Sequence, residues 1–255
     1  MLLRRAQQAG LLRGARLTAV DATGLDARYA STHYRYRYSA RYQQAYAQLH
    51  GGRRPAADHW RPRHPKLTVA ADVDTHLILG AVPGWGPTHD LHGFAPALTQ
   101  AHAQLTALGV RCRGVVADAG YDAERVHVLC RETLGMPTTA IPLNPRTCGR
   151  HGPRTRWRRR MYTAFPHTLY RQRRQVESVF SRLKRRLGAA LTARQASTQQ
   201  QELVLRVLTH NLMLLRRAHR DSQQSKGLSE CADLSPGECH REWRAAAMNA
   251  NGAPR

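Results

Sequence analysis

Three acidic residues in this chain have the types and positions needed to bind divalent cations. Asp21 follows the apolar run of residues 16–20 (RLTAV), and Asp118 follows that of residues 113–117 (RGVVA). Both runs predict short strands, so each aspartate lies where a strand gives way to a turn, the edge at which α/β proteins place their sites. Glu177 lies within a helical pattern further along the chain. Three such carboxylates are suited to hold a pair of Mg²⁺ ions.

The helical pattern of residues 170–184 (YRQRRQVESVFSRLK) sets Glu177 among cations. With about 3.6 residues per turn, a stripe roughly 60° wide holds Tyr170, Arg173, Glu177 and Lys184. The adjoining stripe is apolar and can dock on a core, which predicts that Glu177 lies at the edge of the buried face. Ordinary alternatives stay open: Glu177 as a helical salt-bridge residue, and the two aspartates as turn or capping residues.

The same residues carry a resemblance to a known family. The order and spacing of the helix stripe resemble the YREK signature of bacterial insertion-sequence transposases, which have a DDE catalytic triad and a ribonuclease H-like fold. The segments VDATGL and VVADAGYDAE, which contain the two strand-end aspartates, are similar to the two aspartate motifs of that family and occur in the same order. The resemblance runs from about residue 16 to residue 217.

The resemblance implies a fold, an activity and a set of roles. The fold is α/β, a ribonuclease H-like mixed five-stranded sheet flanked by helices. The activity is hydrolysis of phosphodiester bonds at element ends, followed by strand transfer. Asp21 would bridge two Mg²⁺ ions, for which Mn²⁺ is a substitute, while Asp118 would hold one ion and Glu177 the other. The implied partners are transposon-end and target DNA, bound by a homodimer.

Three further residues of the helix receive roles from the same resemblance. Tyr170, Arg173 and Lys184 would contact the phosphates of the DNA end and position it, without taking part in the chemistry.

Composition supports a nucleic-acid partner. The chain has 40 Lys and Arg against 17 Asp and Glu, a formal net charge of +23, which favours a polyanion. No apolar run approaches the roughly 18 residues of a membrane span, so we expect no membrane partner and a cytoplasmic, nucleoid-associated protein. The five cysteines form no C-x-x-C pair, which indicates neither a disulfide framework nor a common zinc site.

The pattern predicts an α/β order in which three strands precede alternating helices and strands. After the Asp21 strand the predicted elements are a β-hairpin at 66–82, a helix at 91–108 capped by Asp90, a helix at 123–134, a strand at 137–143 and a helix at 197–217. We expect the last helix to bury its leucines in the core, namely Leu203, Leu205, Leu208, Leu212 and Leu215. Residues 1–15 are interpreted as the remnant of a helical region, residues 16–220 as the catalytic domain, and residues 221–255 as a disordered tail.

Two basic segments interrupt this layout. Residues 26–65 predict an excursion in which THYRYRYSARY suits base stacking and phosphate contacts, or equally an amphipathic strand with its tyrosines inward. Residues 144–168 predict a mobile basic loop beside the site. The DNA contacts expected from this loop are Arg156, Arg158, Arg159 and Arg160.

Two other functions stay open at this stage. One is a ribonuclease H-like nuclease or resolvase that stops at hydrolysis, and the other is a basic nucleic-acid-binding protein in which the three acids are structural. The family usually recognises element ends with sequence that precedes the first aspartate. Because few residues precede Asp21, we expect a chain that is truncated or aided by another polypeptide.

Overall fold

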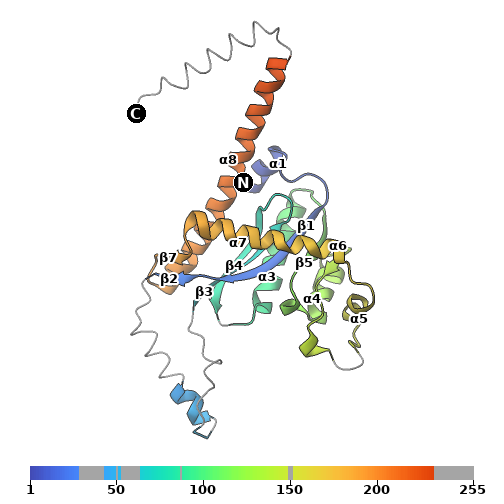
Figure 1. Cartoon of the computed structure of the whole chain (residues 1–255), viewed down its shortest axis with the longest axis vertical. Coiled ribbons are helices and arrows are strands. Elements are labelled where there is room, and N and C mark those ends of the chain that lie inside the picture. Colours follow the sequence, from blue (N-terminus) through green and yellow to red (C-terminus); the bar gives the residue numbers. More distant parts are fainter. Residues whose placement is uncertain (29–42, 50, 53–63, 87, 149–151, 233–255) are drawn as a thin grey trace. The chain divides into compact units, whose positions relative to one another are not determined.

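A five-stranded mixed sheet forms the centre of the fold, in the order β4-β3-β1-β5-β6 (Figure 1). The computed structural model describes residues 1–28, 43–49, 51–52, 64–86, 88–148 and 152–232. The strands are β1 (Arg16–Gly24), β3 (His64–Asp72), β4 (Ile78–Gly86), β5 (Cys112–Val116) and β6 (Thr139–Ala140). β1 pairs antiparallel with β3 and parallel with β5. This arrangement confirms the predicted ribonuclease H-like α/β fold.

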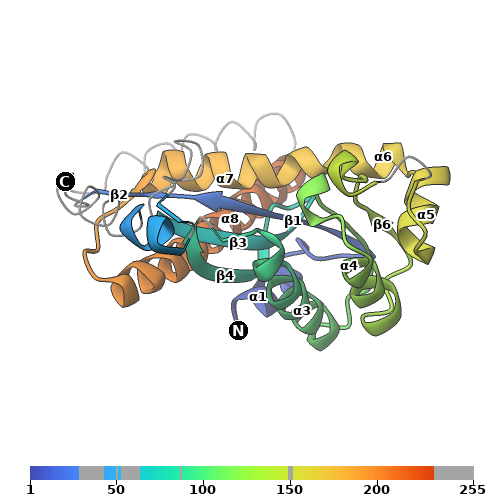
Figure 2. The same ribbon diagram turned by 90° about the horizontal axis from the view of Figure 1, so that it is seen from below.

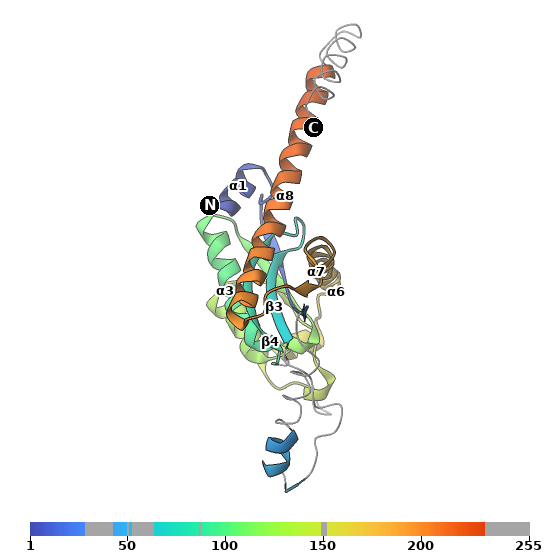
Figure 3. The same ribbon diagram turned by 90° about the vertical axis from the view of Figure 1, so that its left-hand side faces the viewer.

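Helices cover both faces of the sheet. The helix α3 (Leu91–Ala107) packs against β3 and β4, whereas α7 (Arg174–Leu187) crosses β1 on the opposite face (Figures 2 and 3). The short helix α1 (Leu2–Gln8) lies on the α3 side, where the Gln7 side chain donates to the Leu108 carbonyl over 2.8 Å. With both faces covered, the strands are apolar along most of their length, which is why the sequence shows them as continuous runs.

The close packing of α3 on β4 depends on Gly80. A Cβ atom at this position would collide with the Ala97 carbonyl oxygen of α3. On the opposite face, α7 contributes the buried side chains of Val176, Val179 and Phe180 to the core between helix and sheet. The backbone of α7 is thereby fixed above β1, and this fixes the position of its polar edge.

The predicted β-hairpin is confirmed by the antiparallel pairing of β3 and β4. Asp72, at its turn, has a fully buried side chain that accepts two hydrogen bonds from the Arg16 guanidinium, at 2.9 and 2.5 Å. It also accepts from the Thr75 backbone N–H and hydroxyl. Asp72 therefore serves the fold by closing the hairpin onto the start of β1.

The helix predicted from residue 170 is broken in the structure. α6 (His167–Tyr170) is followed by a 3₁₀ turn (Arg171–Arg173), and α7 begins only at Arg174. The change of helical pitch means that the single stripe of the sequence pattern is not one regular helix face. The prediction of a continuous helix was wrong over its first turn.

The prediction of a mobile basic loop was also wrong in part. Arg156–Thr163 form the helix α5, whose Trp157 and Met161 side chains are buried. The composition of the segment does not show its acidic partners, because these lie earlier in the chain. Residues 149–151 of the predicted loop are outside the described part of the chain.

The remaining elements comprise two helices that the sequence predicted and several short elements that it did not. They are the short pair β2 (Asp26–Ala27) and β7 (Ala190–Leu191), a helix at 43–49, the 3₁₀ turns Ala119–Tyr121 and Pro145–Thr147, α4 (Glu124–Val128) with its π-helical continuation Leu129–Thr133, and α8 (Ala196–Ala232). The predicted helix at 123–134 is confirmed, whereas the strand at 137–143 is only two residues long. Most of the basic excursion at 26–65, including its tyrosine-rich stretch, is not among the described residues.

Helix α8 corrects two further predictions. It extends to Ala232, so the disordered tail was wrong for residues 221–232, while residues 233–255 lie outside the described part. Of its leucines, Leu203 is buried, but Leu205, Leu208 and Leu212 are about half exposed. The described chain divides after Leu212 into two compact units, the second of which begins at Met213. In the second, Arg217 lies 3.8 Å from Asp221.

Candidate active site

The register of two neighbouring strands brings Asp21 and Asp118 together. β1 and β5 are parallel, and Ala19 pairs with Val116 at the last matched position. Each aspartate follows that pair by two residues, so both lie just past the end of the β1–β5 pairing. β1 itself continues to Gly24, with Asp21 paired to Val69 of β3, so the prediction that Asp21 ends its strand was wrong. Asp118 then begins the 3₁₀ turn and accepts a hydrogen bond from the Gly120 N–H over 2.9 Å.

One guanidinium group joins these two acids to Glu177. Arg173 Nη2 lies 3.2 Å from Asp21 Oδ2 and 3.8 Å from Asp118 Oδ2, and Nη1 donates to Glu177 Oε1 over 2.6 Å. The three acids, which come from β1, the end of β5 and α7, thus surround a single cation. The structure brings together the three carboxylates that the sequence pattern singled out.

The environment of Asp21 disfavours its charge. Burial raises the pKa of this carboxyl group to about 6, and the neighbouring negative charges of Asp118 and Asp90 add to the rise. A hydrogen bond from the Ala22 N–H at 2.8 Å and the charge of Arg173 oppose it. A carboxylate in this state is held ionised most effectively by a nearby cation.

Asp90 is a member of the cluster that sequence reasoning assigned to another role. It precedes α3, yet its side chain makes no capping hydrogen bond there and forms an ion pair with Lys66. The prediction of a capping side chain was therefore wrong. The Lys66 ammonium group also donates to the Thr88 carbonyl over 2.6 Å, which fixes it beside the cluster.

Two tyrosines border the acids. Tyr121 is fully buried, and its hydroxyl has no hydrogen-bond partner among the described residues. Tyr170 is half-buried and packs edge-on against Phe165, with ring centroids 5.3 Å apart. Burial raises the Tyr170 pKa, while the Arg173 charge acts against the rise. Sequence reasoning missed Tyr121, although its place in the DAGYD segment after Asp118 was a signal that could have shown it.

The donor set fits a divalent cation by its chemistry. All three side chains offer carboxylate oxygens, the ligands that Mg²⁺ prefers, and they already surround a positive group. Within the described residues, no group of three or more His, Cys, Asp or Glu side chains converges closely enough to hold a metal ion. Binding of a cation by all three acids therefore requires them to close in, with Arg173 giving up its contacts.

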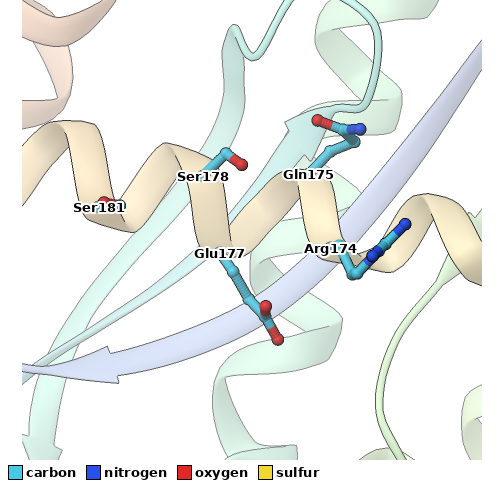
Figure 4. A pocket seen from close by; sticks show the side chains of 5 residues that line it. All are labelled: Arg174, Gln175, Glu177, Ser178 and Ser181. Atoms are coloured by element: carbon cyan, nitrogen blue, oxygen red, sulfur yellow. The ribbon is translucent and has the colours of Figure 1, made fainter.

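A shallow polar depression of about 450 Å³ runs along α7 beside Glu177. Its lining residues are Arg174, Gln175, Glu177, Ser178 and Ser181. Figure 4 shows Glu177 and Arg174 leaving one side of the helix and Gln175 and Ser178 leaving the other. Lys184 lies two turns beyond Glu177, about 10 Å further along the helix axis, and is half-buried.

The basic helix α5 is attached to the loop that follows Asp118. Arg158 donates two hydrogen bonds to the fully buried Asp122 carboxylate, each 2.8 Å long. The Glu124 carboxylate accepts from the backbone N–H groups of Trp157 and Arg158, at 2.9 and 3.0 Å, and so caps the helix. Arg158 thus stabilises the fold, which removes it from the expected DNA contacts.

The other arginines of this helix point outward. Arg156, Arg159 and Arg160 are exposed. The Arg156 guanidinium stacks over the Trp157 ring at 4.5 Å from the centroid. These side chains remain able to meet a polyanion next to the acidic cluster.

Comparison with known proteins adds one finding. Residues 12–212 match the family described as a transposase DDE domain, a span that contains the sheet, α3, α7 and all three acids. No curated protein matches the chain. None of the described helices is long and apolar enough to cross a membrane.

Proposed function

Since the chain belongs to the transposase DDE-domain family, we propose that it is a DNA transposase that cleaves phosphodiester bonds at insertion-sequence ends and joins the freed 3′-hydroxyl to target DNA. The observation that carries the proposal is the meeting of Asp21, Asp118 and Glu177 around one guanidinium. The i,i+4 pair with Arg173 accounts for Glu177 alone, whereas the convergence of acids from three separate elements on one cation in so basic a chain supports a functional site.

Each acid has a distinct part in this proposal. Asp21 is the most buried of the three, which suits it to interact with both Mg²⁺ ions, while Asp118 and Glu177 would each hold one. When bound, the two ions would activate the attacking oxygen and stabilise the leaving oxygen. The protein side chains hold the ligand oxygens in place and exclude water from the Asp21 side of the site.

Arg173 has two successive partners in this account. Its single positive charge offsets part of the repulsion among the three carboxylates. Once those carboxylates bind divalent cations, the guanidinium becomes available to a DNA phosphate, with which it can form two parallel hydrogen bonds. Tyr170, Lys184 and the exposed arginines of α5 extend this phosphate-binding surface. We also propose a homodimer in the DNA complex, because two element ends must be joined together.

The proposal is tested with a supercoiled plasmid that carries the DNA flanking the gene of this protein. Cleavage of the plasmid and strand joining are measured. Asp118→Asn and Glu177→Gln should each lose Mg²⁺-dependent cleavage while DNA binding persists, and the exposed Asp26→Asn serves as a matched control. Cleavage at the wild-type rate by both site variants would refute the assignment. Hydrolysis without joining by the wild-type protein would identify a nuclease of the same fold.

A further inference from the structure

The Tyr121 hydroxyl is in an unfavourable place for a merely structural group. The side chain is 0% exposed, and its oxygen has no hydrogen-bond partner among the described residues. A buried hydroxyl that is left unsatisfied costs about 1–3 kcal/mol. A phenylalanine would fill the same space without this cost, so the hydroxyl requires another explanation.

The backbone fixes this side chain relative to the acids. Tyr121 ends the 3₁₀ turn that Asp118 begins, and its N–H donates to the Asp118 carbonyl over 3.1 Å. Its ring packs on Phe94 of α3, with centroids 5.2 Å apart. With its backbone and ring held in this way, the phenol has little freedom to turn to another partner.

The Tyr121 hydroxyl is affected by the negative charges of Asp21, Asp90 and Asp118. Burial raises the Tyr121 pKa, and the charges of Asp21, Asp90 and Asp118 raise it further, in that order. The phenol is consequently a protonated donor beside groups that accept hydrogen bonds. Among these acids, Asp90 is paired with Lys66, and Asp118 is 37% exposed and open to water. Asp21 is the buried acid that has most need of a fixed donor.

We propose that Tyr121 is a positioning residue whose hydroxyl donates a hydrogen bond to the Asp21 carboxylate and holds it in the orientation that binds the divalent cation. The Asp21 oxygens accept hydrogen bonds from the Ala22 N–H and from Arg173. When Arg173 gives up its contact, the carboxylate can turn toward the phenol. The inference rests on the proposed function, because it assigns Asp21 to metal binding.

Tyr121→Phe tests this role, because it removes one oxygen and keeps the ring. Binding of Mn²⁺ alone, measured by electron paramagnetic resonance without DNA, should weaken by about 10–100-fold, as is usual when a hydrogen-bond partner of a metal ligand is lost. The Mg²⁺ concentration that gives half-maximal cleavage should rise by a similar factor, with little change in the rate at saturating metal. Tyr162→Phe, at an exposed tyrosine of α5, is the matched control.

The melting temperature in EDTA separates positioning from packing. It should be unchanged or higher in Tyr121→Phe, because the hydroxyl has no partner to lose in the metal-free protein. A clear fall would overturn the premise, and Mn²⁺ binding equal to wild type would overturn the role. If wild-type protein binds Mn²⁺ and Asp21→Asn does not, while Tyr121→Phe binds normally, only this inference fails. If wild-type protein neither binds Mn²⁺ nor cleaves DNA, the proposed function itself fails.

Discussion

Replacing Asp21 by Asn should stabilise the metal-free protein increasingly as the pH rises from 4 to 7.5. The Asp21 pKa is raised from 3.8 to about 6 in the fold, chiefly by burial. Between these two values the folded state keeps the proton and the unfolded state releases it, so folding binds a proton and the stability of the wild-type protein falls as the pH rises. Above the Asp21 pKa of the folded state, the free-energy cost of ionising this buried group is fully present, and below 3.8 it disappears.

The shift sets the size of the effect. Each pKa unit corresponds to 1.36 kcal/mol, so ionising Asp21 costs the folded state about 3 kcal/mol at neutral pH. Asn does not titrate and escapes this cost. About 0.5 kcal/mol of this cost is already present at pH 4, so the change up to pH 7.5 is about 2.4 kcal/mol. For a chain of this size, 1 kcal/mol shifts the melting temperature by about 2–4 °C, which predicts a relative gain of about 5–10 °C between pH 4 and pH 7.5. The variant also loses the contact with Arg173, which changes its stability by a similar amount at every pH. The change in the stability difference with pH is therefore the quantity to measure.

Thermal unfolding in EDTA across this pH range provides the assay. Wild type, Asp21→Asn and the exposed Asp26→Asn are compared at each pH, and only the first variant should diverge from wild type. Added Mg²⁺ should close most of the difference at pH 7.5, because a ligand at 100 times its dissociation constant stabilises the wild-type fold by about 2.7 kcal/mol, and the variant lacks the site. A stability difference that stays constant with pH would refute the reasoning about the buried carboxyl group.

Three further predictions concern α5 and the packing of α3. Arg158→Ala should lower the free energy of unfolding by about 3–5 kcal/mol in denaturant, because it leaves the buried Asp122 carboxylate unpaired. Arg159→Ala should change it by less than about 0.5 kcal/mol, and equal losses in the two variants would contradict the inward position of Arg158. In DNA-binding titrations, the double variant Arg159→Ala, Arg160→Ala should reduce the steepness of log affinity against log salt concentration by about 2, with an unchanged melting temperature. An unaltered slope would exclude phosphate contacts by these two arginines. Gly80→Ala should destabilise the protein by about 1–3 kcal/mol, because the added methyl group collides with α3. Gly84→Ala should be tolerated, because a Cβ atom there meets nothing within 4 Å. Similar unfolding midpoints for the two variants would contradict the close approach of α3 to β4.

The residue pattern alone located the two strands and the acids associated with them, although β1 continues past Asp21 to Gly24. Asp21 and Asp118 each follow a run of β-branched and apolar residues, and such a run predicts a buried strand from local pattern alone. The parallel pairing of the two strands then places both acids two residues past its last matched pair. The order of elements, the hairpin and the strongly basic charge were likewise available from the residues.

The partners of the charged and polar groups, in contrast, could be read only from the folded chain. Arg173 meets Asp21 across 152 positions of the chain, while Arg158 turns inward to an acid 36 positions away and Arg159 beside it does not. Periodicity likewise marked Leu205 as a core residue, although it is 59% exposed. The physical reason is that the hydrophobic pattern shows which face of an element is apolar, whereas the neighbour that covers the face, or pairs with its charge, is chosen by contacts distant in sequence.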